Sequence, residues 1–334
     1  MAARITFQEQ GAPEVLALVD CPVPTPAPDQ VLVRVAAAGV NFVDLYQRSG
    51  AYTVQLPFTP GFEASGVVEQ VGESVTEVAV GDRVAWFGSP GGYAEYCLVP
   101  AQRLLPVPDG LDLESAAAAL IQGMTAHFLA HDVTEFGPGS TVLVHAAAGG
   151  VGALLCQYAV RRGARVIGTA SGAVKAAAAH AAGAEHVVLD YSRSGFREQV
   201  RELTGGRGVD VVFDGVGLDT ALEGLDCLRP RGMLVLFGQT SGAVEPIDPQ
   251  LLSAKGSLFL TKASLSHYDT DRAAMLARAG AVFADVLAGR LRLRIHGSYL
   301  LADAALAHQA LESRTAIGKV LLRPAGSATG AASR

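Results

Sequence analysis

The stretch Thr141-Val-Leu-Val-His-Ala-Ala-Ala-Gly-Gly-Val-Gly152 decides how this chain folds. Its first four residues are β-branched or apolar, and they lead through a histidine and three alanines into glycines at positions 149, 150 and 152. Residues 153–162 continue with helix formers. The order of strand, glycine turn and helix opens a βαβ unit, which binds a dinucleotide pyrophosphate at the helix N-terminus. Glycine is needed because a Cβ would keep the backbone N–H groups away from the phosphates.

Two other interpretations of this stretch are a transmembrane span and a βα turn that binds nothing. Residues 141–160 are almost entirely apolar and reach the ~20 residues that a span requires. However, small residues followed by Gly-Gly-Val-Gly make a poor helix centre, and the sequence has no second span. The first glycine of the common G-x-G-x-x-G fingerprint is replaced by Ala147, so the motif is informative only through its flanking strand and helix. We expect cofactor contacts from Ala148, Gly149, Gly150, Val151 and Gly152.

Length and composition indicate a two-domain protein of the cytoplasm. The 334 residues exceed the ~250–300 that one hydrophobic core usually serves. Half of the residues are hydrophobic and 17% are charged, which argues against disorder, and the net charge of −6 argues against a nucleic-acid surface. No basic and apolar leader is recognised, so we expect no export. The four cysteines, Cys21, Cys97, Cys156 and Cys227, form no C-x-x-C pair, as expected in a reducing compartment.

The texture of the chain changes after its first third. Short strands and turns dominate at first, with strands predicted at Arg4–Gln8, Val31–Ala38, Gly66–Val71, Arg83–Phe87 and Glu95–Pro100, and one helix at Phe42–Arg48. A helix at Ala116–His131 then opens a region of alternating strands and helices between Thr141 and Thr261, which predicts a parallel, doubly wound α/β sheet. Strands are predicted in this region at Thr141–Ala146, Arg165–Ala170, His186–Asp190, Val209–Asp214 and Met233–Gly238. The helices between them are predicted at Val151–Arg162, Val174–Ala182, Phe196–Leu203 and Thr220–Leu228. The last elements, from Asp271 to Leu322, are too few to stand alone, so we expect them to complete the first domain.

Several motifs in this order resemble the medium-chain dehydrogenase/reductase superfamily, and within it the zinc-free, ζ-crystallin-like quinone oxidoreductases. The matching stretches are Gly39–Asp44, Arg48–Tyr52, Gly61–Val68, Val80–Val84, Gln122–Ala126, His145–Gly152, Phe237–Gly242 and Glu312–Arg314. The resemblance implies a GroES-like, β-rich catalytic domain built from residues 1–124 and 264–334. It also implies a Rossmann domain at 125–263 that binds NADPH, a cleft where the two domains meet, and a homodimer.

The sequence lacks the residues that would bind zinc. Metal-dependent members of this superfamily carry Cys and His where this chain has Asn41 and Phe62, and neither an amide nor a phenyl ring replaces a thiolate or imidazole. The lobe that holds a structural zinc in those relatives corresponds to residues 86–97, where Cys97 is the only cysteine. We therefore expect no metal. Glu63 is interpreted as a structural or pocket-edge carboxylate, with an acid–base role as the alternative.

Without a Lewis acid the expected chemistry is hydride transfer to an electrophilic acceptor, either a quinone or another conjugated carbonyl compound. NADPH is favoured over NADH, because no acidic residue stands about 20 residues after the glycine turn to bind the ribose hydroxyls. Ser171, Gly172 and Lys175 occupy that region instead, and a cation with a hydroxyl suits a 2′-phosphate. The resemblance adds Tyr191 and Arg314 to this group. A solvated surface lysine and a packed tyrosine are the alternatives for Lys175 and Tyr191.

The resemblance also places residues around the nicotinamide and the substrate. Asn41, Tyr46 and Tyr52 are the expected catalytic residues: an amide that hydrogen-bonds ribose or acceptor, and two flat walls with phenol tips. Core packing is the alternative for both tyrosines. Gln122, Thr125, Phe237, Gly238 and Ser241 are the remaining cofactor contacts, the last three at the carboxyl edge of the sheet. His145 is interpreted as a satisfied residue at a strand end.

Three functions remain open at this point. The leading hypothesis is a zinc-independent NADPH:quinone oxidoreductase that transfers a hydride or single electrons. An NADPH-dependent alkenal or enone reductase would share the fold and the hydride donor, because pocket shape selects the acceptor. A third hypothesis is an NADPH-binding, crystallin-like or RNA-binding protein without turnover, although the net charge disfavours RNA.

Overall fold

The computed structural model describes residues 1–189 and 195–326, and it divides into two compact units. The first unit joins Met1–Ile121 to the chain from Met275 onward, and the second is Gln122–Ala274. The sequence placed these boundaries after residues 124 and 263. Both observed boundaries fall inside long helices, α2 (Leu113–His131) and α8 (Arg272–Leu287). A continuous helix carries no turn residues or change of composition to mark a boundary, which explains the offset.

The second unit is built on a six-stranded sheet in which every pairing is parallel. In spatial order its strands are β10 (His186–Leu189), β9 (Arg165–Ala170), β8 (Thr141–Val144), β11 (Val209–Asp214), β12 (Leu228–Leu236) and β13 (Phe259–Lys262). The chain enters at β8, adds two strands on one side, and then returns to add three on the other. This reversal between β8 and β11 is the switch point at which doubly wound sheets bind ligands, at the carboxyl ends of the strands.

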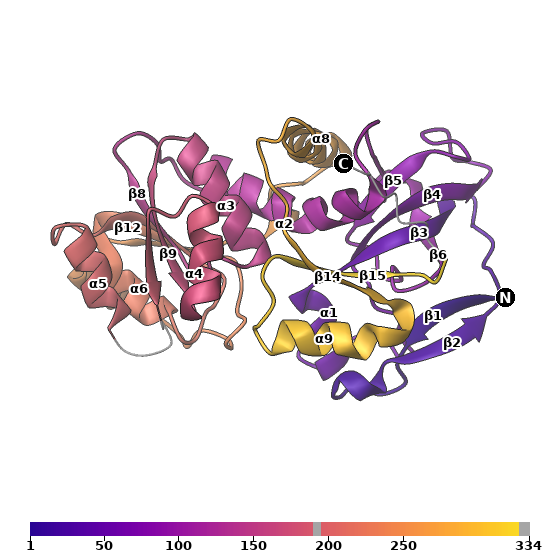
Figure 1. The fold of residues 1–334 in the computed structure, drawn as a ribbon, viewed down its shortest axis with the longest axis horizontal. Helices are drawn as coiled ribbons and strands as arrows, with labels where there is room; N and C mark the ends of the chain where they lie inside the picture. The colour runs from indigo at the N-terminus through magenta and orange to yellow at the C-terminus, as the bar shows by residue number, and fades with distance from the viewer. Residues whose placement is uncertain (190–194, 327–334) are drawn as a thin grey trace. The chain divides into compact units, whose positions relative to one another are not determined.

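Helices cover both faces of this sheet, as Figure 1 shows. On one face lie α3 (Gly150–Arg161) and α4 (Gly172–Ala181), and on the other lie α5 (Phe196–Leu203) and α6 (Ala221–Cys227). Burial on both faces explains why the strands are continuous apolar runs. The side chains of Leu143, Ile167 and Val212 pack with Phe196 and Leu225 in the core beneath α5 and α6. A short helix, α7 (Pro249–Ala254), was not predicted.

The first unit contains a seven-stranded sheet and a separate hairpin. The sheet runs β14 (Ile295–Leu300), β15 (Lys319–Arg323), β3 (Gln30–Val40), β4 (Glu63–Val71), β5 (Arg83–Phe87) and β7 (Leu105–Pro106), with β6 (Tyr96–Pro100) also paired to β3. The hairpin joins β1 (Ala2–Thr6) to β2 (Ala17–Cys21). Strand β15 pairs antiparallel with β3, so the end of the chain completes this unit.

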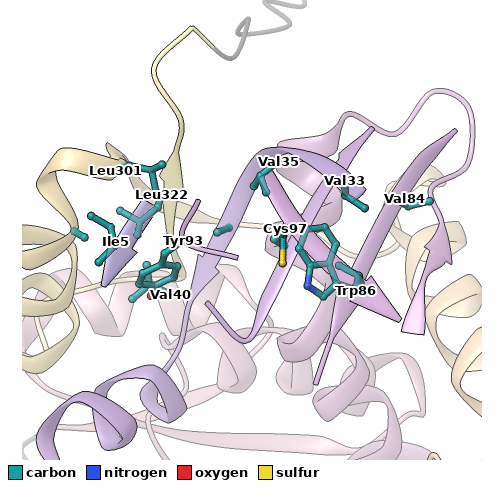
Figure 2. Packing of buried hydrophobic residues seen from close by; sticks show 14 of the residues in the cluster. Ile5, Val33, Val35, Val40, Val84, Trp86, Tyr93, Cys97, Leu301 and Leu322 are labelled. Atoms are coloured by element: carbon teal, nitrogen blue, oxygen red, sulfur yellow. The ribbon is translucent and has the colours of Figure 1, made fainter. Parts of the chain in front are cut away.

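The core of the first unit draws on both chain segments. Figure 2 shows Ile5, Val40 and Tyr93 near Leu301 and Leu322, and Trp86 farther along the same cluster. Helices α1 (Phe42–Ser49) and α9 (Ala304–Glu312) contact each other in this unit. Strands β2 and β7 were not predicted: β2 is largely exposed and β7 has two residues, so neither shows clear alternation. None of the helices described is both long and apolar enough to cross a membrane.

Candidate cofactor and substrate sites

The glycine turn of the second unit is shaped by close backbone approaches. Gly149 is the N-cap of α3, and its N–H donates to the Ala146 carbonyl at 2.8 Å. A Cβ on Gly152 would overlap that same carbonyl oxygen, so only glycine fits there. Ala146 itself has a left-handed conformation with φ 51°, which is uncommon for a residue with a side chain. This close-packed glycine turn, called the cradle below, stands at the start of α3, and a helix start is where a pyrophosphate can bind.

Thr169, at the neighbouring strand β9, supports this turn from behind. Its Oγ1 accepts a hydrogen bond from the Ala146 N–H at 3.2 Å and lies 3.1 Å from Nδ1 of His145. Burial lowers the pKa of His145, against an opposing influence of Asp214. The imidazole is therefore neutral at physiological pH.

Gln122 lies against the first turn of α3. A Cβ on Gly150 would overlap the Gln122 amide, so the glycine makes room for this side chain. Thr125 is half-buried one turn later on α2. The structure thus brings Gln122 to the glycine turn. The expected cofactor contact of Thr125 stays a prediction.

Two loops at the carboxyl edge of the sheet are held together by backbone and side-chain hydrogen bonds. The buried Asp214 carboxylate accepts from the Val216 and Gly217 N–H groups at 2.7 and 3.0 Å. The Ser241 hydroxyl donates to the Val216 carbonyl at 2.8 Å and accepts from the Asp219 N–H at 3.0 Å. Its proton is thus committed to the loop, and a cofactor contact at Ser241 would use its backbone or its remaining lone pair.

Phe237 and Gly238 follow the end of β12 at the same edge. The Phe237 ring lies against Gly215, and a Cβ on Gly238 would approach the Gly215 backbone from the other loop. Both residues are half-buried. The two loops after β11 and β12 therefore form one connected rim beside the switch point.

The start of α4 has the features expected of a 2′-phosphate site. Ser171 is its exposed N-cap, Gly172 has φ 77°, and Lys175 is half-buried in the first turn. A helix N-terminus adds partial positive charge to that of the lysine. Tyr191 lies outside the described residues.

In the first unit the two expected substrate tyrosines contact each other. The rings of Tyr46 on α1 and Tyr52 after it are 5.2 Å apart at 58°, and the Tyr52 N–H donates to the Tyr46 carbonyl at 2.9 Å. Tyr52 is 45% exposed, so it is not a core residue. Burial and the neighbouring Tyr52 raise the pKa of Tyr46 to about 12, and Arg314 opposes this shift. The positive charge of Arg314 therefore acts on Tyr46, whose ring contacts Tyr52.

Asn41 stands at the N-cap of α1 and is almost completely buried, beside two charged groups. Its Oδ1 accepts a hydrogen bond from Lys319 Nζ at 2.8 Å, and its Nδ2 donates to the Gly39 carbonyl at 3.2 Å. Lys319 also forms an ion pair with Glu63 Oε1, and both side chains are buried. Glu63 Oε2 accepts from the Ile121 N–H at 2.8 Å. Glu63 is thus held on one oxygen by an ammonium and on the other by a backbone N–H.

A second group of buried charges ties α1 to the rest of the first unit. Asp44 accepts from the N–H groups of Asn41, Gly61 and Phe62, at 2.9 to 3.1 Å. Burial nevertheless raises its pKa to about 6. On the same helix, Arg48 pairs with Glu312 of α9. These bonds hold α1, and with it Tyr46, in one position.

No three His, Cys, Asp or Glu side chains in residues 1–189 and 195–326 are grouped as metal ligands. The Lys319 ammonium lies between Asn41 and Glu63, near the positions where the sequence lacked zinc ligands. A positive side chain there disfavours a second cation by electrostatic repulsion.

Sequence reasoning missed Lys319, Asp44, Arg48, Thr169 and Asp214. One signal was present for Lys319, which is the single charge in the apolar run Ile317-Gly-Lys-Val-Leu-Leu322. A charge within a buried strand indicates a partner. The identity of that partner is set by strand pairing between distant segments, and the sequence carries no local sign of it.

Two family models match the chain. The alcohol dehydrogenase GroES-like domain matches residues 27–109, and the zinc-binding dehydrogenase family matches residues 150–277. They fall in the first and the second unit, except that the last residues of the second match lie beyond Ala274.

Curated proteins and solved structures are similar over nearly the whole chain. A quinone oxidoreductase of Pseudomonas aeruginosa is 42% identical over 326 residues, which cover 97% of this chain and all of the relative. A 2-haloacrylate reductase of a Burkholderia species is 41% identical over 332 residues, covering 97% and 99%. The crystal structure of Escherichia coli quinone oxidoreductase complexed with NADPH has a TM-score of 0.93 at 39% identity, and the match covers 97% of this chain and all of that one.

Proposed function

This chain belongs to the quinone oxidoreductase family of the medium-chain dehydrogenase/reductase superfamily, and we propose that it reduces quinones with NADPH. The observation that carries the proposal is the glycine turn at the switch point of a doubly wound sheet, in a chain similar over its full length to quinone oxidoreductases. Bound NADPH would supply the hydride, and the quinone would take it up with a proton to become a hydroquinone. The residues of the chain then contribute binding and orientation.

In the second unit, the cofactor would be held by charge and by backbone N–H groups. The cradle at Gly149, Gly150 and Gly152 would bind the pyrophosphate at the start of α3. Lys175 and the exposed Ser171 at the start of α4 would bind the 2′-phosphate.

In the first unit, the quinone would be bound by Tyr46 and Tyr52. Two rings 5.2 Å apart offer apolar area and phenol donors to a flat acceptor. A pKa near 12 keeps the Tyr46 phenol protonated at neutral pH, so it can donate a hydrogen bond to a quinone oxygen. Asn41 would donate a second one.

We propose further that the reaction needs no metal ion. The support is chemical: the residues beside Glu63 are an amide, Asn41, and an ammonium, Lys319, and neither is a zinc ligand. Activity should therefore survive complete removal of metals by a chelator. Loss of activity that zinc restores would refute this proposal.

The first test is NADPH oxidation with 1,4-benzoquinone and 9,10-phenanthrenequinone in chelator-treated buffer, followed by the absorbance of the reduced nicotinamide. A blank without protein is essential, because quinones accept hydride unaided. Turnover well above the blank supports the proposal. NADPH binding without turnover of any acceptor would refute it and favour a cofactor-binding protein without catalysis.

Cofactor choice is tested by Lys175→Glu. Replacing the cation by a carboxylate places like charges together at the 2′-phosphate and should weaken NADPH binding about 100-fold or more, with little change for NADH. Ser171→Ala is the milder control, since it removes only a hydroxyl. Equal effects on the binding of NADPH and NADH would show that Lys175 does not bind the 2′-phosphate.

A second candidate function is reduction of a conjugated C=C bond. The relative named 2-haloacrylate reductase, at 41% identity, favours it. Arg314, whose charge acts on Tyr46, would offer a positive charge to a substrate carboxylate. 2-Chloroacrylate and a 2-alkenal should be assayed beside the quinones. Turnover of 2-chloroacrylate alone would assign this function in place of quinone reduction.

We also propose a cytoplasmic homodimer. The four cysteines are free, as expected where thiols stay reduced. Strand β13 is the edge of its sheet and exposes 52% of Phe259, so it could pair with a second copy. Light scattering coupled to gel filtration measures the mass; a monomer at micromolar concentration would refute the dimer.

A further inference from the structure

Lys319 is a buried ammonium with an unusual set of neighbours. The chain has only four lysines, and this one, at the start of β15, is 2% exposed. Its hydrogen bond goes to Asn41 Oδ1 at 2.8 Å, while its contact with Glu63 Oε1 is an ion pair. Glu63 is itself fixed by the Ile121 N–H. The glycine at position 39 makes this arrangement possible, because a Cβ there would overlap the Glu63 carboxylate.

A lysine ammonium can donate hydrogen bonds but cannot accept them. The amide of Asn41 must therefore turn its oxygen, and not its nitrogen, toward Lys319. The Nδ2 group then points away from the ammonium, and one of its two hydrogens goes to the Gly39 carbonyl at 3.2 Å. Within residues 1–189 and 195–326 the second hydrogen has no acceptor. A rotation of the amide by 180° would place N–H against N–H and lose the bond to Lys319.

We propose that Lys319 is a positioning residue that locks the Asn41 amide as a hydrogen-bond donor to the ligand. The inference rests on the proposed function and adds the chemistry that Asn41 can recognise: an oxygen acceptor, on the cofactor ribose or on the quinone. Glu63 balances the charge of Lys319 and keeps it at this position. Retaining a buried ion pair is costly compared with apolar residues of the same size, so a role in orienting Asn41 explains why this core contains one.

Asn41 is the only asparagine in the chain, which makes the proposal directly measurable. Protein labelled with ¹⁵N-asparagine will show one side-chain NH₂ pair in its NMR spectrum. We expect the two proton shifts to be widely separated and unlike those of a free amide, because each hydrogen has a different, fixed environment. This measurement is made on the free protein, so it does not depend on whether quinones are substrates.

The decisive variant is Lys319→Met with Glu63→Gln. It removes both charges together, keeps the volumes, and leaves an amide oxygen at position 63 to accept from the Ile121 N–H. We expect the NH₂ shifts of the double variant to move away from the wild-type values and toward free-amide values. Unchanged shifts in a folded double variant would overturn the proposal.

Ligand binding separates the two possible acceptors. NADP⁺ and 9,10-phenanthrenequinone are titrated separately into the labelled protein. The ligand that changes the chemical shift of one Nδ2 proton is the one that Asn41 binds. We expect the double variant to bind that ligand about tenfold more weakly. The change is measured as the Kd of the nucleotide or the KM of the quinone, and the constant of the other ligand should change little. If neither ligand moves the proton, Asn41 is not a ligand donor and the proposal fails. Should the methionine variant not fold, Lys319→Gln in the Glu63→Gln background tests the same point, because glutamine can also accept.

Discussion

Gly152→Ala should disrupt the cofactor cradle, although the change adds a single methyl group. The new Cβ would overlap the Ala146 carbonyl oxygen and lie 3.0 Å from the Ala147 Cα. These are backbone atoms, so no side-chain rotation relieves the contact. Ala146 already has φ 51°, a conformation that leaves the turn little freedom to adjust.

The magnitude follows from two opposing contributions. Overpacking in a closely packed site costs about 1–3 kcal/mol. Alanine in a helix is more favourable than glycine by about 1 kcal/mol, and position 152 lies in the first turn of α3. We therefore expect a net loss of about 0–2 kcal/mol in the free energy of unfolding. Displacing the turn should also weaken NADPH binding at least tenfold, which corresponds to about 1.4 kcal/mol.

Gly280→Ala is the matched control for this prediction. Gly280 lies in α8, has an ordinary φ, and has open space where a Cβ would stand. The same substitution there should stabilise the protein by about 0.5–1 kcal/mol and leave NADPH affinity unchanged. Urea unfolding and titration of NADPH fluorescence measure both quantities. If Gly152→Ala binds NADPH as tightly as Gly280→Ala does, the cradle is not where the pyrophosphate binds.

Three further predictions concern other parts of the two units. Gly150→Ala should weaken NADPH binding less than Gly152→Ala, because the three atoms nearest to the new Cβ all belong to the flexible Gln122 amide. Adding Gln122→Ala should restore part of this loss in a double-mutant cycle, and strictly additive losses would show that the backbone is strained instead. Asp44 has a pKa raised from 3.8 to about 6 by burial, so its contribution to stability is complete below pH 3.8 and is lost as the pH rises through 6, by roughly 3 kcal/mol. The free energy of unfolding of the wild type should therefore fall relative to that of Asp44→Asn between pH 4 and pH 7. A difference that does not change with pH would contradict the raised pKa. Tyr46→Phe should leave the unfolding free energy unchanged or slightly higher, because its buried hydroxyl has no hydrogen-bond partner among the described residues, while quinone kcat/KM falls; a loss of more than about 1 kcal/mol would show that the hydroxyl has a structural role.

The sequence predicted the second unit well because its strands have a local signature. Strands buried on both faces are continuous runs of Val, Ile and Leu, and β9, β11 and α5 have the bounds that the pattern predicted. Strand β12 begins earlier than expected, at Leu228, because Arg229-Pro-Arg-Gly232 has the composition of a turn. The residues 231 and 232 are nevertheless part of the strand, with Arg231 at φ 61°.

Local sequence patterns pointed to candidate site residues only where these are neighbours in sequence, as in the glycine turn and at the start of α4. Asn41, Tyr46, Tyr52 and Arg314 were named from the resemblance. By contrast, Asn41 and Lys319 are separated by 278 positions and meet because β15 pairs with β3. Nothing in the periodicity of either segment specifies that pairing, so the amide was expected to face a ligand freely.

The buried charges of the first unit are better explained by orientation than by stability. A lysine and a glutamate enclosed among apolar strands lose the hydration of both ions, and packed apolar residues in their place would be at least as stable. What an apolar pair cannot do is distinguish the two ends of an amide. The two orientations of the amide have nearly the same shape but exchange the hydrogen-bond donor and acceptor. Because Lys319 only donates, it favours the orientation that turns the amide oxygen toward it. A substitution that keeps the volume of Lys319 but removes its donors should therefore change ligand selection at Asn41 before it changes the fold.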